Sequence, residues 1–267
     1  MSRTEAITSA ANPLLKSVRR AIVRGELTAD GFAVAETFHL LEEALRSDCE
    51  VKIVLAAASV EAAVEKHVRR LAGIKVATAP DALFQSVAGT ETSQGVIALV
   101  RPPAWTLQQL FRGRSLVVVL DGLQDPGNAG TIARAAEAFG ATGMMFLKGT
   151  VSPFNAKTLR ASAGSLFRLP FVHGIDAALA RAALQQNGVE VYAGVPGDRD
   201  RAVPLEKADW TRKCGLIIGN EARGVSREMR SAALDVSIPT VGVESLNAAV
   251  AAGILLYEAR RQRAREG

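Results

Sequence analysis

Three loops of the sequence combine glycine or proline with polar side chains that a simple turn does not require. They are "DGLQDPGNAGTIAR" (residues 121–134), "IIGNEARGVS" (217–226) and "SIPTVGVESLNAAV" (237–250). Each contains or follows an apolar run typical of a buried strand. Ligands of open α/β sheets bind beyond the carboxyl ends of the strands. We therefore expect one shared site for the polar side chains of these loops, which are Asn128, Arg134, Asn220, Glu221, Ser245 and Asn247.

The same residues also fit ordinary structural roles. Asp125 followed by Pro126 is a standard helix start, and Asn128 could support that cap. Glu221 could pair with a nearby arginine, and Ser245 could be the N-cap of the last helix. Spacing alone therefore indicates only an α/β enzyme that acts on a small molecule or a nucleotide.

A nicotinamide or nucleotide enzyme is one alternative. A dinucleotide-binding turn requires G-x-G-x-x-G after the first strand and an acidic residue after the second. The first loop provides only Gly127-x-x-Gly130, and Lys148 follows the strand pattern "MMFL". The Gly-Lys-Ser/Thr sequence of a phosphate-binding P-loop is also absent. Both absences count against this alternative.

The composition is that of an ordinary globular protein, with 267 residues, 48% hydrophobic and 22% charged. A net charge of +5 suits a polyanionic partner but does not identify one. The two cysteines, Cys49 and Cys214, and three scattered histidines suggest neither a disulfide nor a metal site. Without a signal core or a bilayer-length apolar run, we expect a soluble cytoplasmic protein.

Strand and helix patterns alternate along the whole chain, which is typical of the α/β class. In residues 1–100, strands such as "VKIVLAA" alternate with helices such as "TFHLLEEALRS", capped by Thr37, and "SVEAAVEKHVRRLAG", capped by Ser59. Two prolines in the segment 101–105 indicate a linker. Residues 106–267 begin again with "SLVVVLDG" and end in a helix from about Leu246 to Arg263. We expect a mostly parallel sheet there, covered on both faces.

Three stretches together resemble the signature motifs of the SpoU (TrmH-type) branch of the SPOUT RNA methyltransferases. They are "DPGNAGTIARAAEAFGA", "LIIGNEARGVS" and "SIPTVGVESLNAAVAAGILLYE". The first 100 residues resemble the substrate-binding domain appended in that family, through "ITSAANPLLKSVRR", "EEAL" and "TETSQGVIALV". The chain departs from the pattern at Ala35-Glu36-Thr37, where related domains usually have a Val-Glu-Gly turn.

The resemblance implies both a fold and an activity. The fold is a small N-terminal α/β RNA-binding domain followed by a SPOUT α/β domain with a C-terminal trefoil knot. The activity is transfer of a methyl group from S-adenosylmethionine, without a metal, to a ribose 2′-hydroxyl in structured RNA, by a homodimer. An extra N-terminal domain favours 23S ribosomal RNA over tRNA. A non-catalytic RNA-binding protein on the same fold is the remaining alternative.

The resemblance also implies roles for individual residues. Gly219, Ile238 and Leu246 would contact S-adenosylmethionine. The family gives the central role to Arg134, sometimes as general base. Because a guanidinium stays protonated and is a poor base, we expect Arg134 instead to hold an RNA phosphate and stabilise the developing alkoxide. The other catalytic candidates would orient the ribose, the loops and the methionine end of the donor; they are Asn128, Glu221, Ser245 and Asn247.

Two groups of basic residues could follow RNA phosphates. Lys16, Arg19 and Arg20 lie on the first predicted helix, and an ordinary solvated helix face is the alternative for them. Lys157, Arg160 and Arg168 lie in an acid-free stretch that follows the first motif. If these residues bind phosphates, RNA affinity must fall steeply with salt.

Overall fold

The computed structural model describes residues 5–69, 71, 73–90, 92–196 and 202–265. Contacts divide the chain into two compact units, which are described separately. The first unit comprises residues 1–104 and 154–168, and the second comprises residues 105–153 and 169–267. The segment 154–168 thus groups with the N-terminal part, although in sequence it lies between two strands of the second unit.

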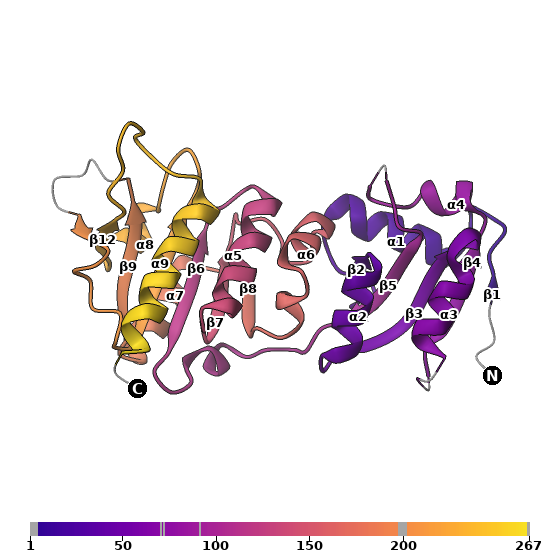
Figure 1. Cartoon of the computed structure of the whole chain (residues 1–267), viewed down its shortest axis with the longest axis horizontal. Helices are drawn as coiled ribbons and strands as arrows, with labels where there is room; N and C mark the ends of the chain where they lie inside the picture. Colours follow the sequence, from indigo (N-terminus) through magenta and orange to yellow (C-terminus); the bar gives the residue numbers. More distant parts are fainter. Residues whose placement is uncertain (1–4, 70, 72, 91, 197–201, 266–267) are drawn as a thin grey trace. The chain divides into compact units, whose positions relative to one another are not determined.

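The first unit contains a five-stranded sheet in the order β1-β4-β3-β5-β2 (Figure 1). β1, β4 and β3 are parallel, and β5 is antiparallel to both β3 and β2. The strands are β1 (Glu5–Ala6), β2 (Ala33–Glu36), β3 (Glu50–Ala57), β4 (Lys75–Ala79) and β5 (Val96–Arg101). The helices are α1 (Pro13–Arg24), α2 (Phe38–Arg46), α3 (Glu61–Val68), α4 (Asp81–Gln85) and α6 (Ala156–Ser162).

Local capping signals explain where α1 begins and ends. The side chain of Asn12 accepts a hydrogen bond from the backbone N–H of Leu14 at 2.8 Å, and Pro13 occupies the first turn. Gly25 ends the helix in the left-handed conformation at φ 64°. The expectation for α3 was less accurate. Ser59 lies in a short 3₁₀ turn and makes no capping hydrogen bond, and α3 ends at Val68.

Thr37 occupies the position where the sequence departs from the Val-Glu-Gly pattern. As expected, it is the N-cap of α2, and its hydroxyl accepts from the backbone N–H of Leu40 at 3.2 Å. Its φ angle, however, is 113°. Only glycine adopts such a conformation without strain, and a β-branched residue there is an outlier. The departure therefore keeps the backbone shape of the glycine turn and adds a capping hydroxyl.

The second unit contains a parallel sheet in the order β10-β12-β9-β11-β6-β7-β8, which confirms the expected parallel arrangement. Its strands are β6 (Leu116–Asp121), β7 (Gly143–Leu147), β8 (Phe171–Ile175), β9 (Glu190–Val195), β10 (Val203–Pro204), β11 (Cys214–Gly219) and β12 (Leu234–Ser237). The helices are α5 (Pro126–Ala138), α7 (Ala177–Gln186), α8 (Arg227–Arg230) and α9 (Ala248–Arg263).

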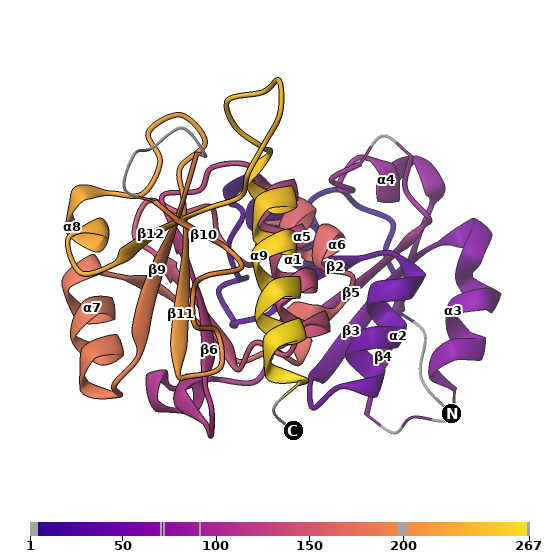
Figure 2. The same ribbon diagram turned by 60° about the vertical axis from the view of Figure 1, so that its left-hand side comes forward.

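Helices cover both faces of this sheet (Figures 1 and 2). Val117, Val119 and Ile217 form a core with residues of α7 and α8 on one face. On the other face, α5 and α9 pack against each other, and α9 contacts the central strand β11. After β11 the chain passes to β12, beyond β9, and then returns to α9. This return places the last loop beside the end of β11.

Arg263 anchors the C-terminal end of α9. Its side chain is buried, with 9% exposed, and it donates only to uncharged acceptors. A guanidinium has five N–H donors in a fixed fork, so it can satisfy several carbonyl groups at once. The acceptors are the carbonyl oxygens of Arg114, Ser115, Trp210 and Arg212 and the sulfur of Cys214. These contacts fix the helix to the amino-terminal ends of β6 and β11.

Replacing Thr37 with glycine should stabilise the protein. Glycine relieves about 1–3 kcal/mol of backbone strain, loses only a few tenths for the cap, and costs about 0.5–1 kcal/mol in chain entropy. We expect a net gain of about 1 kcal/mol in the free energy of unfolding, measured by urea denaturation. Thr37→Ala loses the cap and keeps the strain, so it should destabilise. Equal stabilities for the two variants would contradict this account.

Candidate active site

The carboxylate of Glu221 joins the first motif loop to the second. Its Oε1 accepts from the backbone N–H of Asp125 and from the side-chain amide of Asn128, both at 3.2 Å. Its Oε2 accepts from the backbone N–H of Gln124, also at 3.2 Å. Glu221 therefore binds the side chain of Asn128 and two backbone groups of the first loop.

These hydrogen bonds keep Glu221 ionised. Partial burial raises the pKa of the carboxyl group, but hydrogen bonds from its own backbone N–H, from those of Gln124 and Asp125 and from the amide of Asn128 outweigh it. The pKa of Glu221 is consequently lowered from its ordinary value. An ionised carboxylate only accepts hydrogen bonds, which suits a position surrounded by N–H donors.

Asn247 joins the third loop to the first. Its side-chain nitrogen donates to the side-chain oxygen of Asn128 at 3.0 Å. Its side-chain oxygen accepts from the backbone N–H groups of Ala249 and Val250, at 2.9 and 3.2 Å. Asn247 is therefore the N-cap of α9, and the alternative that gave this role to Ser245 is wrong. The cap lies two residues further on because the loop extends to Asn247.

The second loop turns back tightly on the end of β11. The side chain of Asn220 donates to the carbonyl oxygen of Gly122 at 2.9 Å, and it accepts from the backbone N–H groups of Ala222 and Arg223 at 3.0 Å. Gly219 lies against the returning chain, so a Cβ atom there would be 2.2 Å from the carbonyl carbon of Gly224. Only glycine permits this close approach of two backbone segments.

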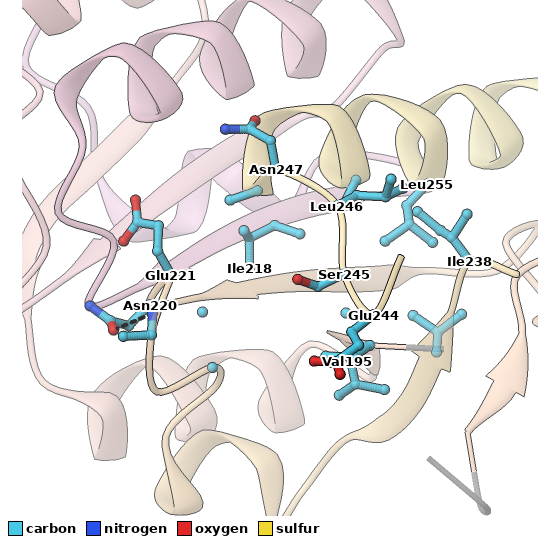
Figure 3. Close-up of a pocket in the computed structure, with 18 of the residues that line it drawn as sticks. Val195, Ile218, Asn220, Glu221, Ile238, Glu244, Ser245, Leu246, Asn247 and Leu255 are labelled. Carbon is cyan, nitrogen blue, oxygen red and sulfur yellow. Dashed lines mark hydrogen bonds between the residues drawn. The ribbon is translucent and has the colours of Figure 1, made fainter. Parts of the chain in front are cut away.

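These loops surround a cavity of about 580 Å³ at the carboxyl ends of β9, β11 and β12 (Figure 3). Apolar side chains of Ile218, Ile238 and Leu255 form one part of its lining. The polar side chains of Ser245 and Asn247 belong to the lining as well. Such a cavity can hold a ligand with a flat apolar part and a polar end.

Six of the eight predicted catalytic and cofactor residues line this cavity. They are Gly219, Glu221, Ile238, Ser245, Leu246 and Asn247. Asn128 does not line it but is bonded to two residues that do. Arg134 also lies outside the lining, on α5, where its side chain is exposed and makes no hydrogen bond or ion pair with the part of the chain that the structure describes.

Several lining residues were not predicted from the sequence. Val195 is the last residue of β9, Pro196 follows it, and Glu244 precedes Ser245. Asn220 was recognised as a polar loop residue but given no role. The end of β9 belongs to none of the three motifs, and the signal for its contribution is the strand order, which places β9 beside both β11 and β12.

The predicted RNA-binding arginines of the segment 154–168 pair with acidic residues of the first unit. Arg160 bonds to Glu36, whose side chain is 3% exposed, and Arg168 bonds to Glu43. In α1, Arg19 is half-buried and contacts Ser86, at 3.3 Å from its hydroxyl. Lys16, Arg20 and Lys157 are exposed. A role in RNA binding stays a prediction for all six residues.

Residues 115–257 match the model of the SpoU rRNA Methylase family. The chain belongs to this family. Residues 12–98 match a second model, the MRM3-like substrate binding domain. The family assignment agrees with the resemblance of the three motifs, whose polar residues converge on the cavity.

Proteins similar in sequence to this chain include rRNA methyltransferases. The 23S rRNA (guanosine(2553)-2′-O)-methyltransferase RlmP of Bacillus subtilis is 33% identical over 95% of this chain and 98% of its own length. A 23S rRNA (uridine(2479)-2′-O)-methyltransferase of Streptomyces viridochromogenes is 38% identical over 71% of this chain and 68% of its own.

Solved structures include an AdoMet-bound rRNA methyltransferase of Sinorhizobium meliloti. It is 29% identical and has a TM-score of 0.82, and the match covers 97% of this chain and 98% of the chain in that structure. The AviRb SpoU methyltransferase of Streptomyces viridochromogenes in complex with AdoMet has a TM-score of 0.83 at 26% identity, over 95% of this chain and 98% of its own.

No helix among the described residues is both long and apolar enough to cross a membrane. Within the same residues, no cluster of three or more His, Cys, Asp or Glu side chains could hold a metal ion.

Removing the charge of Glu221 should destabilise the second unit. In Glu221→Gln, an amide N–H₂ replaces one of the acceptor oxygens, so at least one N–H donor of the first loop loses its partner. Because Glu221 is exposed and its donors are exposed or part-buried, we expect a loss of about 0.5–1.5 kcal/mol in the free energy of unfolding at pH 7. Glu244→Gln is the matched control, because Glu244 is an exposed carboxylate of the same cavity.

The effect should depend on pH in one direction. Because the folded protein lowers the pKa of Glu221, its contribution is present above the ordinary value of about 4.5 and is lost as the pH falls through the lowered pKa. The stabilities of Glu221→Gln and of the unmodified protein should therefore converge in acid. A difference that grows as the pH falls would contradict this assignment.

Proposed function

We propose that this protein is an S-adenosylmethionine-dependent RNA methyltransferase that modifies a ribose 2′-hydroxyl of 23S ribosomal RNA. One observation carries the proposal. The hydrogen bonds that Asn128 donates to Glu221 and accepts from Asn247 bring the three SpoU motifs to the edge of one cavity. The names of the relatives and the AdoMet-bound neighbours support the same reaction.

The cavity has the shape and chemistry that S-adenosylmethionine requires. Gly219 lets the second loop fold back closely and present its backbone groups at the cavity wall. Ile238 and Leu246 provide apolar contacts for the adenosine part, and Ser245 lies in the same loop for the methionine part. When bound, the donor supplies a methyl group that its own sulfonium makes electrophilic, so no metal is needed.

We assign Arg134 to the RNA rather than to the donor. Its side chain is exposed on α5, outside the cavity lining. A guanidinium binds a phosphate through two parallel hydrogen bonds and keeps its proton. Arg134 would therefore hold a phosphate next to the target ribose and stabilise the oxygen as negative charge develops on it. Asn128 would orient the ribose at the mouth of the cavity.

We also propose that a trefoil knot forms where the last loop returns to α9.

A homodimer is proposed as well, formed through the outer face of α9. Val250 and Tyr257 lie seven residues apart on that helix and are 52% and 56% exposed. Tyr257 contacts Phe139 edge to face, with ring centroids 5.9 Å apart, which extends the apolar surface to the end of α5. Large exposed apolar residues at this spacing favour burial against a second copy.

Replacing Tyr257 with glutamate should therefore give a monomer. A charge at the centre of an apolar interface costs several kcal/mol unless it is paired. Light scattering across a range of protein concentrations measures the change in mass. An unmodified protein that stays monomeric at high concentration would contradict the proposed interface. Leu179→Glu is the matched control, because Leu179 is an apolar residue of α7, 51% exposed, on the other face of the sheet.

Replacing Arg134 with alanine should abolish methyl transfer while leaving S-adenosylmethionine affinity unchanged. Loss of one such donor lowers kcat by about 10²–10³-fold. Arg134→Lys should restore little, because an ammonium group lacks the two-pronged geometry. The activity of both variants is measured as transfer of a labelled methyl group to 23S ribosomal RNA purified from cells without the gene. Mapping of the 2′-O-methyl positions shows which ribose is modified. Normal turnover by Arg134→Ala would exclude this role.

A further inference from the structure

A second cavity lies within the first unit. It has a volume of about 420 Å³, and every residue that lines it belongs to residues 57–95. It lies at the carboxyl ends of β3 and β4, which are parallel neighbours, because its lining includes Ala57, the last residue of β3, and Asp81, two residues after the end of β4. This is the position at which ligands bind in open α/β sheets. The first cavity has the same position in the second unit.

One wall of this cavity depends on a glycine. Gly95 has a φ of +77°, and an added Cβ atom would lie 2.8 Å from the side chain of Val60. The carbonyl oxygen of Gly95 accepts from the backbone N–H of Ala57 at 2.8 Å. The segment before β5 is therefore held close against the end of β3.

The lining combines the apolar side chains of Ala57, Ala82 and Phe84 with hydrogen-bonding side chains, among them those of Asp81 and Gln94. At Asp81, Oδ1 accepts from the hydroxyl and the backbone N–H of Ser59. At Gln94, Oε1 accepts from the backbone N–H of Phe38 at 3.0 Å. Within the described residues, Oδ2 of Asp81 and Nε2 of Gln94 have no hydrogen-bond partner. Asp81 and Gln94 thus offer a ligand one acceptor and one donor.

The charge of the lining excludes a phosphate as the ligand. Asp81 is an acid, and the lining contains neither lysine nor arginine. A nucleobase fits instead, because it has flat apolar faces and an edge with both donors and acceptors. The cavity volume is within the range of small-molecule sites. Proteins that read RNA sequence mostly bind unstacked bases on such edges.

We propose that this cavity binds one unpaired nucleobase of the RNA substrate. The proposal rests on the proposed function, since it takes RNA as the substrate, and it assigns the base to the domain that matches a substrate-binding model. Asp81 accepts from an N–H group of the base, Gln94 donates to a ring nitrogen or carbonyl oxygen, and the base lies over Ala82. Guanine suits these groups because its Watson–Crick edge has adjacent N–H donors beside a carbonyl oxygen.

Methyl-labelled NMR spectra of the full-length protein test this assignment directly. Guanosine 5′-monophosphate is titrated to millimolar concentration, and ribose 5-phosphate serves as the probe without a base. We expect saturable shifts at the methyl groups of Ala57, Val60 and Ala82 with the nucleotide only. Equal shifts with both probes, or no saturable shift at these residues, would overturn the proposal.

Variants connect the cavity to the RNA. Ala82→Trp fills the cavity without removing a side-chain hydrogen bond, and Asp81→Asn keeps the shape but loses the charge. Asp48→Asn is the matched control, an exposed aspartate of the same unit that does not line the cavity. We expect both cavity variants to raise the KM for RNA by about tenfold or more, because each loses one good base contact. The kcat and the affinity for S-adenosylmethionine should stay unchanged. An unchanged KM in Ala82→Trp would refute the proposal.

The two proposals fail in different ways. If no RNA is methylated, the proposed function is wrong, and nucleotide binding at Ala57, Val60 and Ala82 still decides whether this cavity holds a base. If RNA is methylated but the NMR shifts are absent, the proposed function stands and the base site is wrong. Unfolding curves and S-adenosylmethionine affinity, measured for each variant, show that a raised KM does not reflect a misfolded protein.

Discussion

The geometry of the site depends on one carboxylate that binds N–H groups of another loop. A parallel sheet brings the carboxyl ends of its strands to one edge, but it does not fix the loops that follow them. Glu221 provides that constraint through Gln124, Asp125 and Asn128. The hydrogen bonds that position the loop are also those that lower the pKa of Glu221, so the carboxylate is ionised wherever the arrangement is intact. The geometry and the charge therefore have one cause.

Asn128 and Asn247 extend this constraint to the last helix. Each amide uses both of its ends, so neither residue can be replaced by aspartate without losing a donor. Asn247 also caps α9, and Arg263 anchors the opposite end of the same helix. The cap position therefore sets where the third loop ends relative to the first. Helix stability and the position of the cavity edge are coupled through a single side chain.

The sequence predicts well what depends on neighbouring residues. The caps predicted at Thr37 and Asp125 and the buried strands are local signals, and the structure contains them. The cap predicted at Ser59 is wrong, because the hydroxyl of this residue bonds to Asp81 instead. The choice between Ser245 and Asn247 was wrong because both can cap a helix and only the length of the preceding loop decides. Contacts between distant residues are not encoded locally, so the bond from Arg160 to Glu36, 124 positions apart, gave no signal. The same holds for the contribution of β9 to the cavity.

The position of Arg134 limits how the reaction can be arranged. The cavity lies at the ends of β9, β11 and β12, whereas Arg134 lies on α5 outside its lining. In the arrangement proposed above, with the donor in the cavity and an RNA phosphate on Arg134, the ribose hydroxyl would meet the methyl group at the edge between them, where Asn128 connects α5 to the lining residues Glu221 and Asn247. The substrate RNA itself would then complete the site. Such a site aligns the hydroxyl with the methyl group only when the correct RNA is bound, and this favours transfer to a specific ribose over reaction with water.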